Sequence, residues 1–158
     1  MMNLCCDVLR ALEGKMLVTA ESCTGGGIGS ALTSVPGSSS VYRGGVICYS
    51  NWVKESVLGV DHDALEQYGA VSEVVAGQMA SGVKQLMKAD VAVSVTGLAG
   101  PGGDDHGHEV GAVFIGCQYG QNLVIKEFHF AGDRDAVRRQ AVEAALYLII
   151  DMVGKEKE

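Results

Sequence analysis

The chain has 158 residues, 47% of them hydrophobic, which is enough apolar surface for one domain with a substantial core. Its formal net charge of −7, with Arg138-Arg139 as the only adjacent basic pair, excludes the clustered cationic surface of a nucleic-acid-binding protein. No apolar run approaches the roughly 20 residues of a membrane span, no signal-peptide stretch opens the chain, and its five cysteines form no CxxC pair, so we expect a cytoplasmic protein without a membrane partner.

Hydrophobic residues at helical and strand spacing predict alternating helices and strands along the chain. Leu4 and Val8 belong to a first helix that Gly14 ends, and Ser72 and Asp133 are placed to cap later helices. Other predicted helices span residues 25–35, 64–70 and 72–88, residues 51–60 are expected to hold a helical turn or two, and a last helix follows Asp133. The predicted strands span residues 15–20, 44–50, 90–97, 110–120 and 123–132.

The last two predicted strands are separated only by a short Gly-Gln-Asn turn, which is typical of a β-hairpin. The earlier strands alternate with helices, which is typical of parallel pairing. Together these patterns predict a three-layer α/β/α sandwich with a mixed sheet, formed by a single domain of residues 1–158.

The stretch TAESCTGGGI runs from a strand into a helix through three glycines and holds two potential nucleophiles, Ser22 and Cys23. At such a junction, backbone N–H groups and the positive end of the helix dipole face open space and stabilise negative charge. We therefore expect the turn of Thr24, Gly25 and Gly26 to bind a substrate phosphate or the oxyanion of an acyl-transfer intermediate. The stretch matches neither a Walker A loop nor the GxGxxG motif.

A serine nucleophile needs a base, and the histidines are poorly placed for that role. His62 lies among acidic residues, His129 alternates in a strand, and the DDHGHE segment lacks an established ligand spacing, so we expect no metal site. The remaining arrangement is a Ser–Lys pair with Lys54, in which Tyr49 passes the proton or orients the groups. A free lysine has a pKa near ~10.4, so burial must lower the pKa of Lys54 before it can act as a base at neutral pH.

Six collinear segments, AESCTGG, PGSS, YSNxxK, GAVSEVVAGQMA, TGLAGPGG and GDRDAVRRQA, cover the chain from about Lys15 to Ala145. Together they resemble the CinA C-terminal domain family, whose stand-alone members are nicotinamide-nucleotide amidohydrolases. The resemblance implies an α/β fold, a homodimer or higher homo-oligomer, and no metal or other cofactor. It also implies hydrolysis of the carboxamide of nicotinamide mononucleotide (NMN) to nicotinate mononucleotide and ammonia, a step in pyridine-nucleotide recycling.

The resemblance also implies roles for individual residues. The nucleophile, proton relay and general base would be Ser22, Tyr49 and Lys54. Thr96 matches a polar position near the substrate amide, and Arg138 matches a substrate-binding arginine of the last helix. Because Arg134 lies four residues before Arg138 on the same helix face, either guanidinium could reach a phosphate.

One segment departs from the family pattern. His108 and Glu109 stand where many members have Lys-Pro, and Ala112 stands where they have Thr. This departure affects any contact that the loop makes with substrate, and it leaves the three catalytic positions unchanged.

Two alternative functions remain open from the sequence. In the first, Cys23 is the nucleophile of an amidase together with Glu21 and Lys54. In the second, the chain is a non-catalytic nucleotide-binding module that keeps the phosphate-binding turn.

Overall fold

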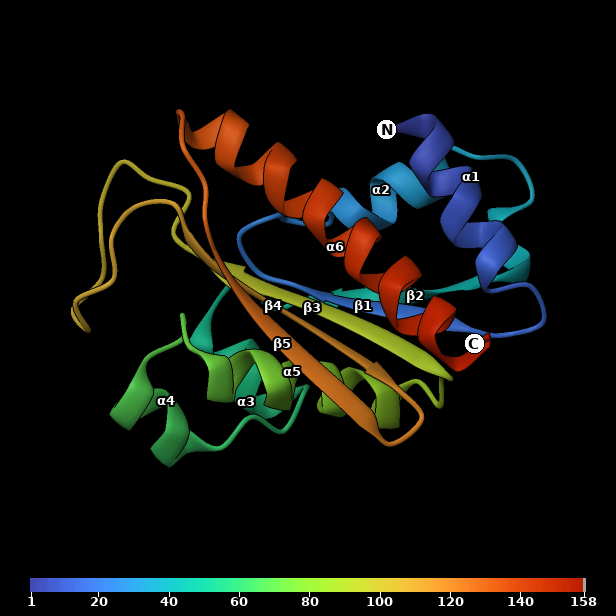
Figure 1. Ribbon diagram of the computed structural model, residues 1–158. Coiled ribbons are helices and arrows are strands. Elements are labelled where there is room, and N and C mark those ends of the chain that lie inside the picture. Colours follow the sequence, from blue (N-terminus) through green and yellow to red (C-terminus); the bar gives the residue numbers. More distant parts are fainter. Residues whose placement is uncertain (158) are drawn as a thin grey trace.

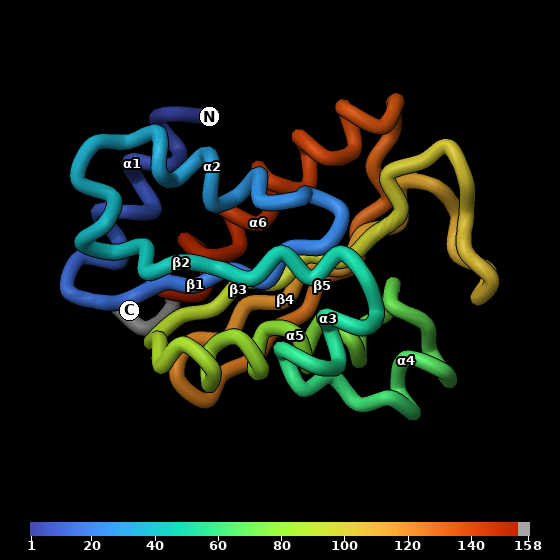
Figure 2. The backbone as a smooth tube through the Cα atoms, turned by 180° about the vertical axis from the view of Figure 1, so that it is seen from behind, coloured from blue at the N-terminus to red at the C-terminus, as the bar shows by residue number. Residues whose placement is uncertain are grey.

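The computed structural model describes the backbone of residues 1–157 and the side chains of residues 1–154, and it shows a mixed sheet with helices on both faces (Figure 1). The strands are β1 (Leu17–Glu21), β2 (Tyr42–Ile47), β3 (Val91–Gly97), β4 (Ala112–Tyr119) and β5 (Asn122–His129). The helices are α1 (Met2–Ala11), α2 (Gly27–Thr33), α3 (Asn51–Ser56), α4 (His62–Tyr68), α5 (Glu73–Leu86) and α6 (Arg134–Lys157), with a 3-10 turn η1 (Ser38–Ser40). Helices α1, α2 and α6 cover one face and α3, α4 and α5 the other (Figures 1 and 2), so the predicted three-layer α/β/α sandwich is confirmed.

The strand order is β2-β1-β3-β4-β5. Strand β1 runs parallel to both β2 and β3, whereas β4 and β5 form the predicted antiparallel hairpin. In this register Glu21, the last residue of β1, lies opposite Ile47 of β2 and Val95 of β3. The carboxyl ends of the three parallel strands therefore meet at one edge of the sheet. The chain leaves β1 toward β2 on one side and returns to β3 on the other, and α/β sheets bind ligands at such a switch point.

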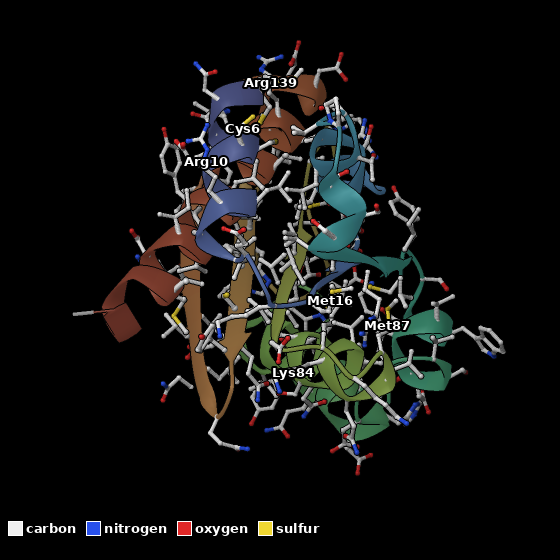
Figure 3. All side chains as sticks on the ribbon, turned by 90° about the vertical axis from the view of Figure 1, so that its right-hand side faces the viewer. Cys6, Arg10, Met16, Lys84, Met87 and Arg139 are labelled. Atoms are coloured by element: carbon white, nitrogen blue, oxygen red, sulfur yellow. The ribbon has the colours of Figure 1, made fainter. Side chains whose placement is uncertain are left out.

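Hydrophobic packing on both faces explains why the central strands carry few polar side chains. Strands β1 and β3 are buried along almost their whole length. On one side Ile115 and Ile149 belong to the core cluster beneath α6, and on the other Val18 and Met79 belong to the cluster beneath α5. Figure 3 shows the two layers side-on, with Arg139 on the α6 side and Lys84 on the α5 side.

The two predicted helix caps are confirmed. The Ser72 hydroxyl accepts a hydrogen bond from the N–H of Val75 at 3.2 Å, and the Asp133 carboxylate accepts one from the N–H of Ala136 at 2.9 Å. These caps satisfy donors that the first turns of α5 and α6 leave without an intrahelical partner.

Several predicted boundaries were wrong by a few residues, and two of them lie beside the carboxyl edge of the parallel strands. Helix α2 begins at Gly27 rather than at Gly25, because Gly25 and Gly26 adopt φ angles of +59° and +97°, which a right-handed helix does not accept. Strand β2 begins at Tyr42, opposite Leu17, and ends at Ile47, because the residues after it turn away from the sheet toward α3.

Candidate active site

Ser22 follows the last residue of β1 and remains tied to the sheet. Its backbone N–H donates to the carbonyl of Val95 in β3 at 3.0 Å, and its own carbonyl accepts from the N–H of Gly25 at 3.0 Å. The second bond closes a tight turn directly after the serine, and the positive φ angles of Gly25 and Gly26 permit a second turn, in which the N–H of Gly27 donates to the carbonyl of Thr24 at 3.0 Å. The hydroxyl is thus carried by a short turn that is anchored at both ends.

Lys54 comes from α3 on the opposite side of the edge, and its side chain is only 1% exposed. Ser50 caps this helix through a bond from the N–H of Val53 at 3.3 Å. The Nζ of Lys54 lies 3.0 Å from the Oγ of Ser22 and donates to the carbonyl of Cys48 at 2.7 Å. The structure therefore brings the predicted nucleophile and base into direct hydrogen-bonding contact.

Burial lowers the pKa of Lys54 from its ordinary value of 10.5, although the nearby thiols of Cys48 and Cys23 oppose the change. The hydrogen bonds of this nitrogen also favour the neutral amine over the ammonium. An ammonium has three N–H donors, whereas two oxygens accept from this nitrogen among the described residues. A neutral amine fits better, because it donates to Cys48 and can accept the proton of the Ser22 hydroxyl.

The space expected in front of α2 is filled, which corrects the sequence interpretation of this helix end. The buried carboxylate of Glu21 accepts from the N–H of Ile28 at 2.7 Å and from the N–H of Gly29 at 3.1 Å. It also accepts from the Thr24 hydroxyl at 2.7 Å. These backbone donors are therefore already satisfied by an internal anion and are not free to bind a phosphate.

The turn residues Thr24, Gly25 and Gly26 do not line the cavity around Ser22. The hydroxyl of Thr24 donates to Glu21, and the N–H of Gly25 donates to Ser22, so neither group faces that cavity as a free donor. Gly26 instead lines a separate hollow beside Ile47. The structure therefore gives no support for the expected contact of Thr24, Gly25 and Gly26 with substrate in this cavity.

Tyr49 lies in the cavity wall, but its hydroxyl makes no hydrogen bond to Ser22 or Lys54 within the described part of the chain. It accepts instead from the Nη2 of Arg134 at 3.0 Å, while the Nη1 of Arg134 donates to the carbonyl of Gly100 at 2.6 Å. The structure thus groups Tyr49 with a cation at the mouth of the cavity rather than with the Ser–Lys pair.

Of the remaining predicted site residues, Thr96 lines the cavity and Arg138 does not. The Thr96 hydroxyl donates to the carbonyl of Ala70 at 2.8 Å, which leaves its oxygen able to accept a hydrogen bond. The guanidinium of Arg138 lies behind the serine turn, where Nε donates to the carbonyl of Cys23 at 3.0 Å and Nη2 to that of Thr24 at 3.3 Å.

The cavity has a volume of about 490 Å³ and extends from the Ser–Lys pair to the glycine-rich loop after β3. That loop projects beyond the sheet at the left of Figure 1. The ring of His106 lies against Gly69 at the end of α4, within 3.3 Å of the carbonyl of Glu66. His108 closes the loop through its backbone N–H and its Nδ1, which lie 2.9 and 2.8 Å from the carboxylate oxygens of Asp104.

The loop departure at His108 therefore has a local structural role. Its ring also lies edge-on to Phe114, with centroids 5.9 Å apart.

Within the described residues, no three His, Cys, Asp or Glu side chains gather as a possible metal site. No helix in the same part of the chain is long and apolar enough to cross a bilayer.

Cys23 lines the cavity beside Ser22, yet its thiol is unsuited to act as a nucleophile. Burial raises the pKa of this thiol to about 11, and the backbone N–H of Cys23 and the guanidinium of Arg138 only partly offset that effect. The thiolate is therefore scarce at neutral pH. This argues against the alternative in which Cys23 rather than Ser22 attacks the substrate.

Sequence reasoning missed the far wall of the cavity, which is formed by Leu65 of α4 and by Gly69, Ala70 and Val71. These residues are apolar or small and carry no chemical signal. The collinear GAVSEVV segment was the only sign that this region mattered. It also missed the carbonyl of Cys48 as the second partner of Lys54, because a backbone group has no sequence signature.

The profile of the CinA C-terminal domain matches residues 2–153. CinA-like proteins of Rippkaea orientalis and Thermotoga neapolitana are 50% and 46% identical over 143 and 132 residues. The matches cover 89% and 84% of this chain but 34% and 32% of those proteins, so the chain spans about one third of the length of the curated relatives it matches.

Solved structures match over nearly their whole length. The competence damage-inducible protein A of Klebsiella pneumoniae superposes with a TM-score of 0.95 at 36% identity, covering 97% of this chain and 96% of that one. The competence/damage inducible protein of Agrobacterium tumefaciens superposes with a TM-score of 0.91 at 38% identity, covering 95% and 93% of the two chains.

Proposed function

Because the chain belongs to the CinA C-terminal domain family, we propose that it hydrolyses the carboxamide of NMN to nicotinate mononucleotide and ammonia. The observation that carries this proposal is the 3.0 Å contact between the Oγ of Ser22 and the buried Nζ of Lys54. A pure binding site has no need for a buried amine, whose desolvation costs free energy. A nucleophile that must lose a proton does need one.

In the proposed reaction, the Oγ of Ser22 bonds to the carboxamide carbon while its proton passes to the neutral amine of Lys54. Collapse of the tetrahedral intermediate breaks the C–N bond, and the ammonium of Lys54 returns the proton to the departing ammonia. The same amine then takes a proton from water, which attacks the acyl-enzyme, releases nicotinate mononucleotide and restores the serine.

The cavity supports a mononucleotide as substrate. Its volume of about 490 Å³ lies within the range of small-molecule sites. With the carboxamide at Ser22, the oxygen of Thr96, which lines the same cavity, would accept a hydrogen bond from the substrate –NH2 group, and the cation of Arg134 in the cavity wall would bind the phosphate. In this arrangement Tyr49 supports Arg134 rather than relaying protons.

The test is ammonia release from NMN by the purified chain and by two variants, Ser22→Ala and Lys54→Met. We expect turnover by the wild type and a loss of at least about 10³-fold in kcat for each variant, because the nucleophile and its base act as one unit. A thermal shift with NMN but no ammonia from the wild type would refute the proposal and favour the non-catalytic module. Full activity of Ser22→Ala would refute the assignment of the nucleophile.

A further inference from the structure

Arg138 donates hydrogen bonds to the backbone of the turn that carries the nucleophile. Its Nε and Nη2 donate to two successive carbonyls, those of Cys23 at 3.0 Å and Thr24 at 3.3 Å. The residue lies outside the cavity lining, whereas Arg134, four residues earlier on the same helix, is part of it. The two arginines are thus separated into one that faces the cavity and one that faces the backbone behind it.

These bonds fix the orientation of peptide planes. In a trans peptide the C=O and the following N–H point in opposite directions. The carbonyl of Cys23 points to Arg138, so the N–H of Thr24 points away from it. Likewise the bond to the Thr24 carbonyl orients the N–H of Gly25, which donates to the Ser22 carbonyl and so fixes the peptide that contains the N–H of Cys23.

Two backbone donors remain without a use in this turn. The N–H groups of Cys23 and Thr24 donate to no other residue that the structure describes. Cys23 lines the cavity directly after the nucleophile. Donors beside an attacking serine are the usual means of stabilising the negative oxygen of a tetrahedral intermediate.

We propose that Arg138 is a positioning residue, which holds the Ser22–Gly25 turn so that the N–H of Cys23, the turn residue that lines the cavity after the nucleophile, donates to the oxyanion. Its positive charge beside the Thr24 carbonyl also strengthens the N–H of Gly25 as a donor to the Ser22 carbonyl, and this bond in turn polarises the peptide that carries the N–H of Cys23. This inference rests on the proposed nucleophilic role of Ser22, but it does not depend on NMN being the substrate. It replaces the expected direct contact between Arg138 and substrate.

The decisive variant is Arg138→Met, which keeps the length and apolar stem of the side chain and removes the donors and the charge. Arg139→Met is the matched control, since Arg139 is the next residue of α6 and is exposed on the outer layer (Figure 3). Arg138→Lys serves as a second variant, because it keeps the cation if the loss of both hydrogen bonds prevents folding.

The first measurement is steady-state turnover of NMN. With Arg138→Met we expect kcat to fall about 10²-fold with KM changed less than about threefold, which is the loss typical of a disturbed oxyanion donor. Arg138→Lys should lie between it and the wild type, and Arg139→Met should match the wild type. An increase in KM with kcat preserved would overturn the proposal, because it would show that Arg138 binds the substrate directly.

The second measurement uses an alkyl fluorophosphonate, which carries no nucleotide. The Oγ of Ser22 bonds to phosphorus, fluoride leaves, and the serine proton passes to Lys54, so the rate followed by intact mass reports the activated serine and its oxyanion donors. We expect a comparable fall for Arg138→Met. An unchanged rate for this variant, or no labelling of Ser22 in the wild type, would overturn the inference. Labelling without ammonia release from NMN would refute the proposed substrate alone.

Discussion

Replacing Lys54 with methionine removes an amine that is only 1% exposed, and the pH dependence of the stability change reports the charge of that amine. Burial lowers the pKa of Lys54 below 10.5 in the folded chain, while the unfolded chain keeps the ordinary value. Between these two values the unfolded state holds one proton more than the folded state. Wild-type stability therefore rises with pH across this window, and at lower pH the full burial penalty applies.

The size of the effect follows from linkage. Relative to Lys54→Met, the wild type should gain stability with a slope approaching about 1.4 kcal/mol per pH unit within the window. For a domain of this size, each kcal/mol corresponds to a Tm shift of about 2–4 °C. Effects of the substitution that do not titrate, such as the lost bond to Cys48, cancel from the slope because they are constant with pH.

The assay is urea denaturation of both proteins at several pH values from 7 to 10, with Lys126→Met at an exposed position of β5 as the control for losing one lysine. The quantity to compare is the difference in unfolding free energy from the wild type. A flat difference for Lys54→Met over the whole range would mean that Lys54 has its ordinary pKa in the folded chain. The general-base role would then lack its physical basis.

Three further substitutions test the site from other sides. Cys23→Ser should keep NMN turnover within about tenfold, since its thiol has a pKa of about 11 and is not the nucleophile; loss of labelling at Ser22 in this variant would contradict that assignment. Glu21→Gln turns an amide –NH2 toward backbone donors of α2 and should lower the unfolding free energy by about 1–3 kcal/mol, whereas an unchanged denaturation midpoint would show that the carboxylate is dispensable. Gly25→Ala adds a Cβ at φ +59°, 3.3 Å from the Nη2 of Arg138, and should cost about 1 kcal/mol and lower kcat; wild-type kinetics would show that the turn tolerates displacement.

The layered fold was predictable because each element has a local signal. The apolar run of residues 90–97, the Ser72 cap and the hairpin turn each indicate their structure without reference to the rest of the chain. The boundary errors occurred where a tertiary condition decides, as at Gly25, whose positive φ is required by the turn from Thr24 to Gly27.

The site was predictable in its chemistry and less so in its geometry. A Ser–Lys pair follows from the absence of a suitable histidine, and the structure places both residues at the edge where β1 and β2 end. The roles of Tyr49 and Arg138 could not be resolved, because spacing along α6 puts Arg134 and Arg138 on one face and does not say which of the two reaches the cavity. The sequence around Glu21 also gives no sign that its carboxylate accepts hydrogen bonds from the backbone N–H groups at the start of α2.

The buried position of the Glu21 carboxylate affects how the protein binds its ligand. Three contacts hold the serine turn before any molecule enters the cavity. The Glu21 carboxylate accepts from α2, Arg138 of α6 donates to the carbonyl of Cys23, and the N–H of Ser22 donates to Val95. The serine turn is therefore preorganised, and little reorganisation energy remains to be spent there during catalysis. A ligand-bound structure should superimpose on the free one at residues 21–26, and any adjustment that accompanies binding should fall on the glycine-rich loop after β3.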